Sequence, residues 1–104
     1  MTHPTNGLDD TVHQRVRLGI LAVLEESRRA DFGYLREVLE LTDGNLARHL
    51  QTLGDAGYVK IEKTIDRNRP RTWVSATKQG RAALRSEVSS LRALLAVIER
   101  RPAL

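Results

Sequence analysis

The sequence contains no cysteine, which excludes disulfide bonds, thiolate metal sites and thiol-based redox sensing. It also has no apolar run that approaches the roughly 20 residues of a membrane-spanning helix. The N-terminal residues lack the charged and apolar regions of a secretion signal. These absences together predict a cytoplasmic protein that does not associate with a membrane.

Residue patterns typical of enzymes are missing as well. There are no paired carboxylates, no Ser/His/Asp set and no glycine-rich phosphate loop, and the glycines are scattered at helix ends and turns. The three histidines, His3, His13 and His49, do not have the spacing of metal ligands. We therefore predict a protein that is not an enzyme, with no catalytic residue, metal site or cofactor.

The chain is basic, with 17 Lys and Arg against 13 Asp and Glu, and this balance favours an anionic partner. The positive excess is unevenly distributed. Residues 1–41 carry five Arg and seven acids, a net charge of −2, whereas residues 42–78 carry seven basic and four acidic residues, a net of +3. Residues 79–104 carry five Arg and two Glu, again a net of +3. The elements that contact the partner are therefore expected to begin near residue 42.

The N-terminal part of the chain predicts a tail and two helices. Residues 1–8 are polar and predict a flexible tail, residues 12–27 predict a helix, and residues 33–40 predict a second one. The residues of the second helix expected to face inward are Tyr34, Leu35, Val38 and Leu39. The first helix is apolar on two sides, with Leu18 and Leu21 on the second side. In so short a chain, this second side is expected to contact another subunit.

A third helix and a β-hairpin are predicted next. A turn around Thr42 provides an N-cap for a helix that ends near Asp55. Apolar and polar residues alternate over 58–64 and predict a strand, and the β-prone segment 72–76 predicts its partner. The polar, proline-containing segment 66–71 is expected to be the loop between the two strands.

A long final helix is predicted from its cap, Thr77, to about Arg101. Its apolar residues are spaced by four and three positions, which is the pattern of a heptad seam. These residues are Leu84, Val88, Leu91, Leu95 and Ile98. The seam covers about two heptads, so it is expected to pack either on the first helix of the same subunit or across a dimer.

The predicted order of three helices, a hairpin and a long helix is that of a winged helix-turn-helix domain. Three motifs support it in order and spacing: LARHL at 46–50, LGDAGYV at 53–59 and TKQGR at 77–81. With these motifs the chain resembles winged-helix transcriptional regulators of the MarR and ArsR type, and most of all the family of short stand-alone winged helix DNA-binding domains. The resemblance covers about residues 8–95. It implies a dimeric regulator that binds duplex DNA, and we expect a mainly helical α+β fold with one domain over residues 9–101.

The polar side of the third helix is the predicted contact with the major groove. With the leucines of this helix directed inward, at about 100° per residue, the polar residues between them face outward. Arg48 suits guanine, Gln51 or Asn45 suits adenine, and threonine hydroxyls suit phosphate oxygens. The contacts predicted on this side are Thr42, Gly44, Asn45, Arg48, Gln51 and Thr52.

The hairpin provides the second predicted contact. Arginines alternate near its tip, and guanidinium groups bind phosphates with two hydrogen bonds or enter a narrow minor groove. The contacts predicted here are Lys63, Arg67, Arg69 and Arg71. We expect Asp66 to orient Arg67 or Arg69, and we expect this tip to share one outer surface with the polar side of the third helix.

The sequence therefore predicts a homodimeric transcriptional regulator that reads the major groove with residues 43–55 and the backbone or minor groove with residues 65–72. DNA half-sites lie about 34 Å apart, so two copies are needed to span a palindrome. The predicted dimer contacts are Leu18, Leu21, Leu84, Val88, Leu91, Leu95 and Ile98. Alternatively, the same surface binds a protein partner without DNA. RNA or single strands would require more exposed aromatic residues, and no pattern identifies a small-molecule effector.

Overall fold

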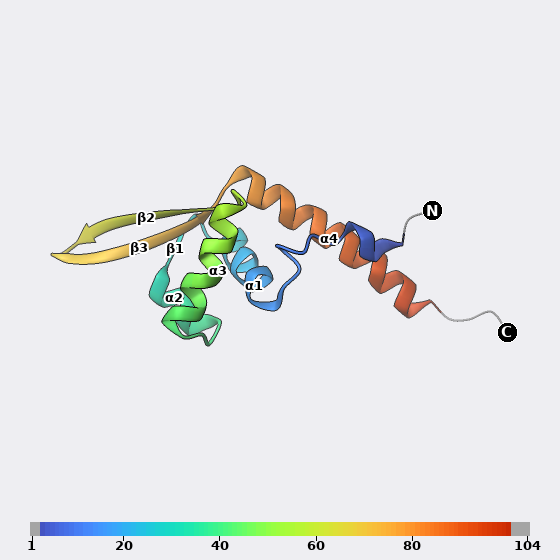
Figure 1. The fold of residues 1–104 in the computed structure, drawn as a ribbon, viewed down its shortest axis with the longest axis horizontal. Coiled ribbons are helices and arrows are strands. Elements are labelled where there is room, and N and C mark those ends of the chain that lie inside the picture. Colours follow the sequence, from blue (N-terminus) through green and yellow to red (C-terminus); the bar gives the residue numbers. More distant parts are fainter. Residues whose placement is uncertain (1–2, 101–104) are drawn as a thin grey trace.

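The computed structural model describes residues 3–100, with elements in the order η1, α1, β1, α2, α3, β2, β3, α4 (Figure 1). The helices are η1, a 3-10 helix (Pro4–Gly7), α1 (Arg15–Glu26), α2 (Phe32–Val38), α3 (Asp43–Asp55) and α4 (Lys78–Glu99). The strands are β1 (Ala30–Asp31), β2 (Val59–Asp66) and β3 (Arg69–Ala76). This order confirms the predicted α+β winged-helix fold, with a three-helix core, a hairpin and a long last helix.

Helices α1 and α3 supply most of the hydrophobic core. The apolar residues of α3 recur every three or four positions, so this helix turns one side inward, whereas α1 is buried over a wider surface. The buried side chains are Val16, Ile20, Leu21 and Leu24 of α1 and Leu46, Leu50 and Leu53 of α3. Leu35 of α2 and Val74 of β3 are fully buried in the same core. This packing holds α3 against the domain with its polar side outward.

Helix α1 begins later than the sequence pattern predicts. The side-chain oxygen of Gln14 accepts two amide hydrogens of the first turn, each at 2.9 Å. Gln14 is therefore the N-cap, and the helix begins at Arg15 rather than at residue 12. Asp9 instead accepts the amide hydrogen of Thr11, at 2.8 Å, in the turn before the helix.

The prediction of a flexible tail over residues 1–8 is wrong for Pro4–Gly7, and the first two residues lie outside the described part. Pro4–Gly7 form η1, which contacts α4. A methyl group added to Gly7 would come within 2.5 Å of a serine hydroxyl oxygen on α4. The next segment is also attached, because Asp9 donates its amide hydrogen to the buried carboxylate of Glu87, at 3.1 Å.

Helix α2 turns a single stripe of residues toward the core. Of the four residues predicted to face inward, Leu35 is fully buried and Leu39 is partly buried. Tyr34 and Val38 are instead 52% and 48% exposed, so the prediction is wrong for these two. Residues four apart share one stripe of a helix, so the leucine pair occupies the inner stripe and the other pair the neighbouring outer one.

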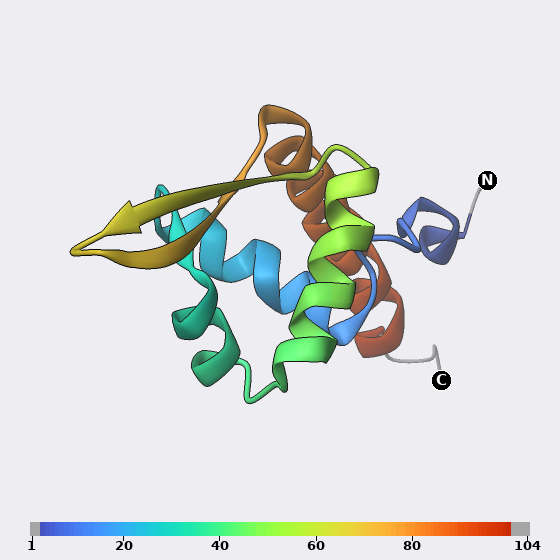
Figure 2. The ribbon, with the colours of Figure 1, turned by 60° about the vertical axis from the view of Figure 1, so that its left-hand side comes forward.

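The boundaries of α3 agree with the prediction. The hydroxyl oxygen of Thr42 accepts the amide hydrogen of Asn45, at 3.1 Å, so Thr42 is the N-cap. After Asp55 the chain turns at Gly57, whose φ of 81° lies in the left-handed region that glycine adopts without strain. Helix α2, the turn that follows it and α3 form the predicted helix-turn-helix (Figure 2).

The three strands form an antiparallel sheet in the order β1-β3-β2. Strands β2 and β3 pair along their whole lengths, up to Asp66 with Arg69. The turn therefore contains two residues, Arg67 and Asn68, whose φ values are 52° and 63°. Two residues with positive φ form a tight turn that suits the twist of a hairpin. The predicted loop over residues 66–71 is therefore wrong, and the long hairpin projects from the helices (Figure 1).

Helix α4 begins after the predicted cap, Thr77, and extends away from the rest of the domain (Figure 1). It ends at Glu99, and the predicted end near Arg101 lies outside the described residues. Its first half is packed on the domain through Leu84, whereas Leu95 and Ile98 in its second half are exposed. None of the helices in residues 3–100 is long and apolar enough to cross a membrane.

Two of the predicted dimer contacts belong to the core of this subunit. Leu21 is 1% exposed and Leu84 is 8% exposed, so neither side chain is accessible to a second subunit, and the prediction is wrong for both. The second apolar side of α1 is therefore covered within the same chain. Leu18 and Leu91 are partly buried.

Candidate nucleic-acid interface

The outward side of α3 is polar and open to solvent. Gly44, Asn45, Arg48 and Gln51 are exposed, as their helical angles predict. Arg48 donates a hydrogen bond to the side-chain oxygen of Asn45, at 3.3 Å. A methyl group added to Gly44 would meet no described atom within 4 Å, so a ligand has room to approach the backbone there. This side therefore offers guanidinium and amide groups to a ligand.

The two threonines of this side differ in what they can donate. The hydroxyl oxygen of Thr42 accepts an amide hydrogen as the N-cap, and its own hydrogen remains for an acceptor. The hydroxyl of Thr52 instead donates to the carbonyl oxygen of Arg48, at 3.2 Å. Because an ionised phosphate oxygen accepts hydrogen bonds, Thr42 is better suited than Thr52 to bind one.

The first turn of α3 carries an acid whose charge is compensated. Asp43 accepts a hydrogen bond from Arg36 of α2, at 2.7 Å, and this partner raises the pKa of Arg36. An unpaired carboxylate here would repel an anion from the positive end of the helix dipole. The ion pair reduces that repulsion, so the N-terminus of α3 stays compatible with a phosphate.

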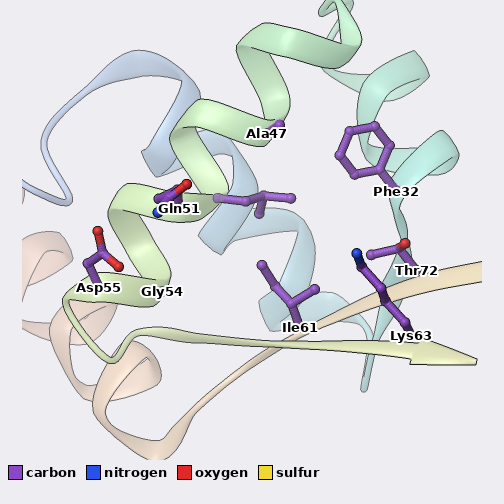
Figure 3. Close-up of a pocket in the computed structure, with 9 residues that line it drawn as sticks. Phe32, Ala47, Gln51, Gly54, Asp55, Ile61, Lys63 and Thr72 are labelled. Carbon is purple, nitrogen blue, oxygen red and sulfur yellow. The ribbon is translucent and has the colours of Figure 1, made fainter.

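A groove of about 510 Å³ lies between α3 and the hairpin (Figure 3). Gln51 and Asp55 line it on the α3 side, and Ile61 and Lys63 line it on the β2 side. The other lining residues are Phe32, Ala47, Leu50, Gly54 and Thr72. The groove thus places one predicted contact of α3, Gln51, across from one predicted contact of the hairpin, Lys63.

The basic residues of the hairpin are divided between its two faces. Directly opposed residues of paired strands point to the same side of a sheet. Lys63 is opposite Thr72, and both line the groove beside α3. Arg69 and Arg71 occupy the alternate positions of β3 and therefore lie on the other face. Arg67 stands in the turn, at the end of the hairpin.

Arg71 is bound by other residues of the domain. Its Nε and Nη2 atoms donate to Oδ2 of Asp31, at 3.1 and 2.8 Å, and Nη1 donates to Oδ2 of Asp66, at 2.9 Å. Its guanidinium group also lies 4.8 Å from the ring centre of Trp73. The prediction that Asp66 orients a different arginine of the tip is therefore wrong. Three of the five donors of Arg71 are engaged within the protein.

His49 lies on the inner edge of α3, and its Nδ1 atom is 3.1 Å from Nη1 of Arg17. Arginine can only donate, so this ring nitrogen is the acceptor and carries no proton. Burial, with the positive charges of Arg17, Arg48 and Arg15, lowers the pKa of His49. Within residues 3–100, no group of three His, Asp or Glu residues is arranged to hold a metal ion.

Sequence reasoning did not assign Ala47, Asp55 or Phe32 to the site, although all three line the groove. Ala47 faces outward on α3, and Asp55 lies one helical turn after Gln51, so the helical period indicates both. Phe32 begins α2, and it reaches the groove because β1 pairs with β3. No local sequence signal indicates that long-range pairing.

Comparisons with known sequences identify relatives over most of the chain. The model of a family described as winged helix DNA-binding domain matches residues 16–95. An uncharacterized protein of Methanocaldococcus jannaschii is 38% identical over 84 residues, which cover 81% of this chain and 91% of that protein.

Solved structures share the fold over nearly the whole length. A transcriptional regulator homologue of Pyrococcus horikoshii OT3 has a TM-score of 0.87 and 35% identity, covering 96% of this chain and all of that one. The M. tuberculosis transcriptional regulator MosR in complex with DNA has a TM-score of 0.71 and 23% identity, covering 91% of this chain and 68% of that one. A MarR-family regulator from Rhodococcus sp. RHA1 also has a TM-score of 0.71, at 17% identity, covering 96% of this chain and 71% of that one.

Proposed function

Because the chain belongs to the winged helix DNA-binding domain family, we propose that it is a transcriptional regulator that binds duplex DNA as a homodimer. Helix α3 enters the major groove, and the β2–β3 hairpin lies along the backbone or in the adjacent minor groove. The observation that carries this proposal is the groove that Gln51 and Lys63 both line. MosR, a protein of the same fold, has been solved in complex with DNA, which supports DNA binding by this fold.

The side chains of α3 suit the recognition of bases. Arg48 presents a planar group that matches the two acceptors of guanine, and Gln51 matches the donor and acceptor of adenine. Arg48 is exposed and bound to Asn45 by a long hydrogen bond of 3.3 Å, which is easily exchanged for one to a base. Asp55, at the end of the groove, suits the amino group of cytosine. Specificity is therefore expected to come from this side of the domain.

The hairpin suits the phosphate backbone. Lys63 lies in the groove, Arg67 stands at the turn, and Arg69 lies beside it. These cations contact phosphates of any sequence and supply affinity that salt weakens. Thr42, the N-cap of α3, is expected to donate its hydroxyl hydrogen to a further phosphate.

The second half of α4 suits a contact between two copies of the chain. Val88, Leu95 and Ile98 are 37%, 53% and 70% exposed, and Leu91 lies on the same seam. The elongated molecule measures 67 × 24 × 22 Å, because α4 and the hairpin project from it. Burial of this stripe in a dimer, together with the partly buried Leu18 of α1, removes apolar surface from water and provides two α3 helices for two half-sites.

A salt series with three arginine variants tests the proposal. Duplexes selected from a random pool are titrated with the protein, and binding is followed by fluorescence anisotropy. Arg67→Ala is expected to weaken binding to all duplexes and to reduce the log–log salt slope by about one. Arg48→Ala is expected to reduce the preference for the selected sequence, at a cost of about 1–3 kcal/mol. Arg100→Ala, at the far end of α4, is the control for the loss of one positive charge.

The outcomes separate the two functions that the sequence allows. Normal binding by both Arg67→Ala and Arg48→Ala would show that these roles are wrongly assigned. No duplex binding by the wild-type chain at low salt would overturn the DNA-binding proposal and favour a protein partner. Recovery of a palindrome from the pool would support the homodimer.

A further inference from the structure

Arg71, Asp31, Asp66 and Trp73 form a cluster on the hairpin face that points away from the groove, and we name this cluster the hairpin latch. Its members come from β1, β2 and β3. The guanidinium group of Arg71 forms ion pairs of 2.8 Å with Asp31 and 2.9 Å with Asp66. Arg29, which precedes β1, lies 3.8 Å from the ring centre of Trp73. The latch therefore connects the hairpin to the body of the domain.

Asp31 has two roles in the latch. Its Oδ1 atom accepts the amide hydrogen of Tyr34, at 2.7 Å, and so caps α2, while Oδ2 accepts both bonds from Arg71. The hydrogen bond from the Tyr34 amide lowers the pKa of Asp31 most, and the hydrogen bond from Arg71 lowers it further. One carboxylate thus connects the start of the helix-turn-helix to the hairpin strand.

The latch lies at the point where the hairpin extends beyond β1. Strand β1 pairs with β3 at two positions, Ala30 with Val74 and Asp31 with Trp73. Arg71 lies two residues closer to the tip than Trp73, where β3 has passed the end of β1. A two-stranded hairpin alone is marginally stable in water. The latch is therefore placed where the hairpin leaves the support of the third strand.

We propose that Asp31 and Arg71 are positioning residues that set the hairpin against α3 before DNA binds. The inference rests on the proposed function and names the residues that prepare its binding surface. It gives Arg71 a role different from a phosphate contact, because three of its five donors are bound to Asp31 and Asp66. A hairpin that is already ordered loses less conformational freedom on binding, so affinity is higher.

Asp31→Asn tests the latch because its charge effect and its positioning effect have opposite signs. Asparagine is as good an N-cap as aspartate, so α2 keeps its cap. DNA is a polyanion, so the loss of a negative charge near the interface should by itself strengthen binding. The latch predicts instead that binding weakens about three- to tenfold, because the hairpin must be ordered during binding.

Two further variants define the comparison. Glu62→Gln removes one negative charge from the same hairpin face, opposite Trp73, and within residues 3–100 Glu62 forms no ion pair. Its binding is expected to equal or exceed that of the wild type. Arg71→Lys keeps the positive charge but lacks the planar group that reaches two carboxylates. It is expected to weaken binding as Asp31→Asn does, without a change in salt slope.

Amide hydrogen exchange of the protein without DNA provides a second readout. In Asp31→Asn, amides of β2 and β3 are expected to exchange faster than in the wild type and in Glu62→Gln, while amides of α3 stay unchanged. Binding by Asp31→Asn as tight as that of Glu62→Gln, or unchanged exchange, would overturn the latch. If the wild type binds no duplex, the proposed function fails, and hydrogen exchange alone decides whether the latch orders the hairpin.

Discussion

Gly80 is in the first turn of α4 and touches the backbone of the segment that leads into β2. A methyl group added there would overlap the carbonyl oxygen of Tyr58 and lie 2.8 Å from its carbonyl carbon. The same oxygen accepts the amide hydrogen of Thr77, at 3.0 Å. The obstacle is backbone rather than the end of a flexible side chain. Gly80→Ala therefore requires α4 and the Tyr58 segment to move apart.

The expected destabilisation follows from two opposing terms. Alanine favours a helix over glycine by about 0.8–1 kcal/mol. Overpacking of a closely packed site costs about 1–3 kcal/mol, and the backbone contact of Gly80 places this site near the upper end. We therefore expect Gly80→Ala to lower the free energy of unfolding by about 1–2 kcal/mol, which lowers the Tm by about 5–15 °C.

Gly54→Ala is the matched control, because it makes the same change in α3. A methyl group at Gly54 would meet no described atom within 4 Å, so this variant is expected to gain up to about 1 kcal/mol. Urea unfolding at one protein concentration, followed through the fluorescence of the single tryptophan, measures both variants. A Gly80→Ala protein as stable as the wild type would refute the close contact between α4 and the Tyr58 segment.

Three other perturbations test the remaining features. Folding lowers the pKa of His49, so the unfolded chain binds more protons than the folded protein as the pH falls below about 6.5, and the free energy of unfolding decreases there. His49→Gln should reduce this decrease, measured by urea titrations at pH 5 and pH 7.5. Glu87→Ala leaves the amide of Asp9 without its acceptor and should cost about 1–3 kcal/mol in the same assay, while Glu87→Gln, which keeps an acceptor oxygen, should cost less. Leu95→Lys should weaken self-association in sedimentation equilibrium, whereas Ile65→Lys, at a 79% exposed position of the hairpin, should not.

The features that the sequence predicts well are those that depend on neighbours in the chain. Thr42 caps α3 and Thr77 caps α4. In each cap the threonine hydroxyl oxygen accepts the amide hydrogen of the residue three positions later. The buried leucines of α3 follow from the helical period. The outward, polar side of α3 follows from the same period, so this half of the candidate site is accessible to sequence reasoning.

The features that the sequence does not predict depend on contacts between distant segments. The ion pair of Asp31 with Arg71 joins residues that are forty positions apart. The burial of Leu21 on the second side of α1 has the same origin, because the chain itself covers a side that composition alone assigns to another subunit. No local pattern contains this information, since it arises when β1 pairs with β3 and the helices pack.

The division of basic residues between the hairpin faces shows how one local detail controls the site. Lys63, Arg69 and Arg71 are all at odd-numbered positions, and alternation along one strand would place them together. A two-residue turn pairs Asp66 with Arg69, so odd positions of β2 are opposite even positions of β3. A turn of three residues would pair odd with odd and turn both arginines toward the groove. The length of the turn therefore decides that Lys63 faces α3 and that Arg71 can reach Asp31.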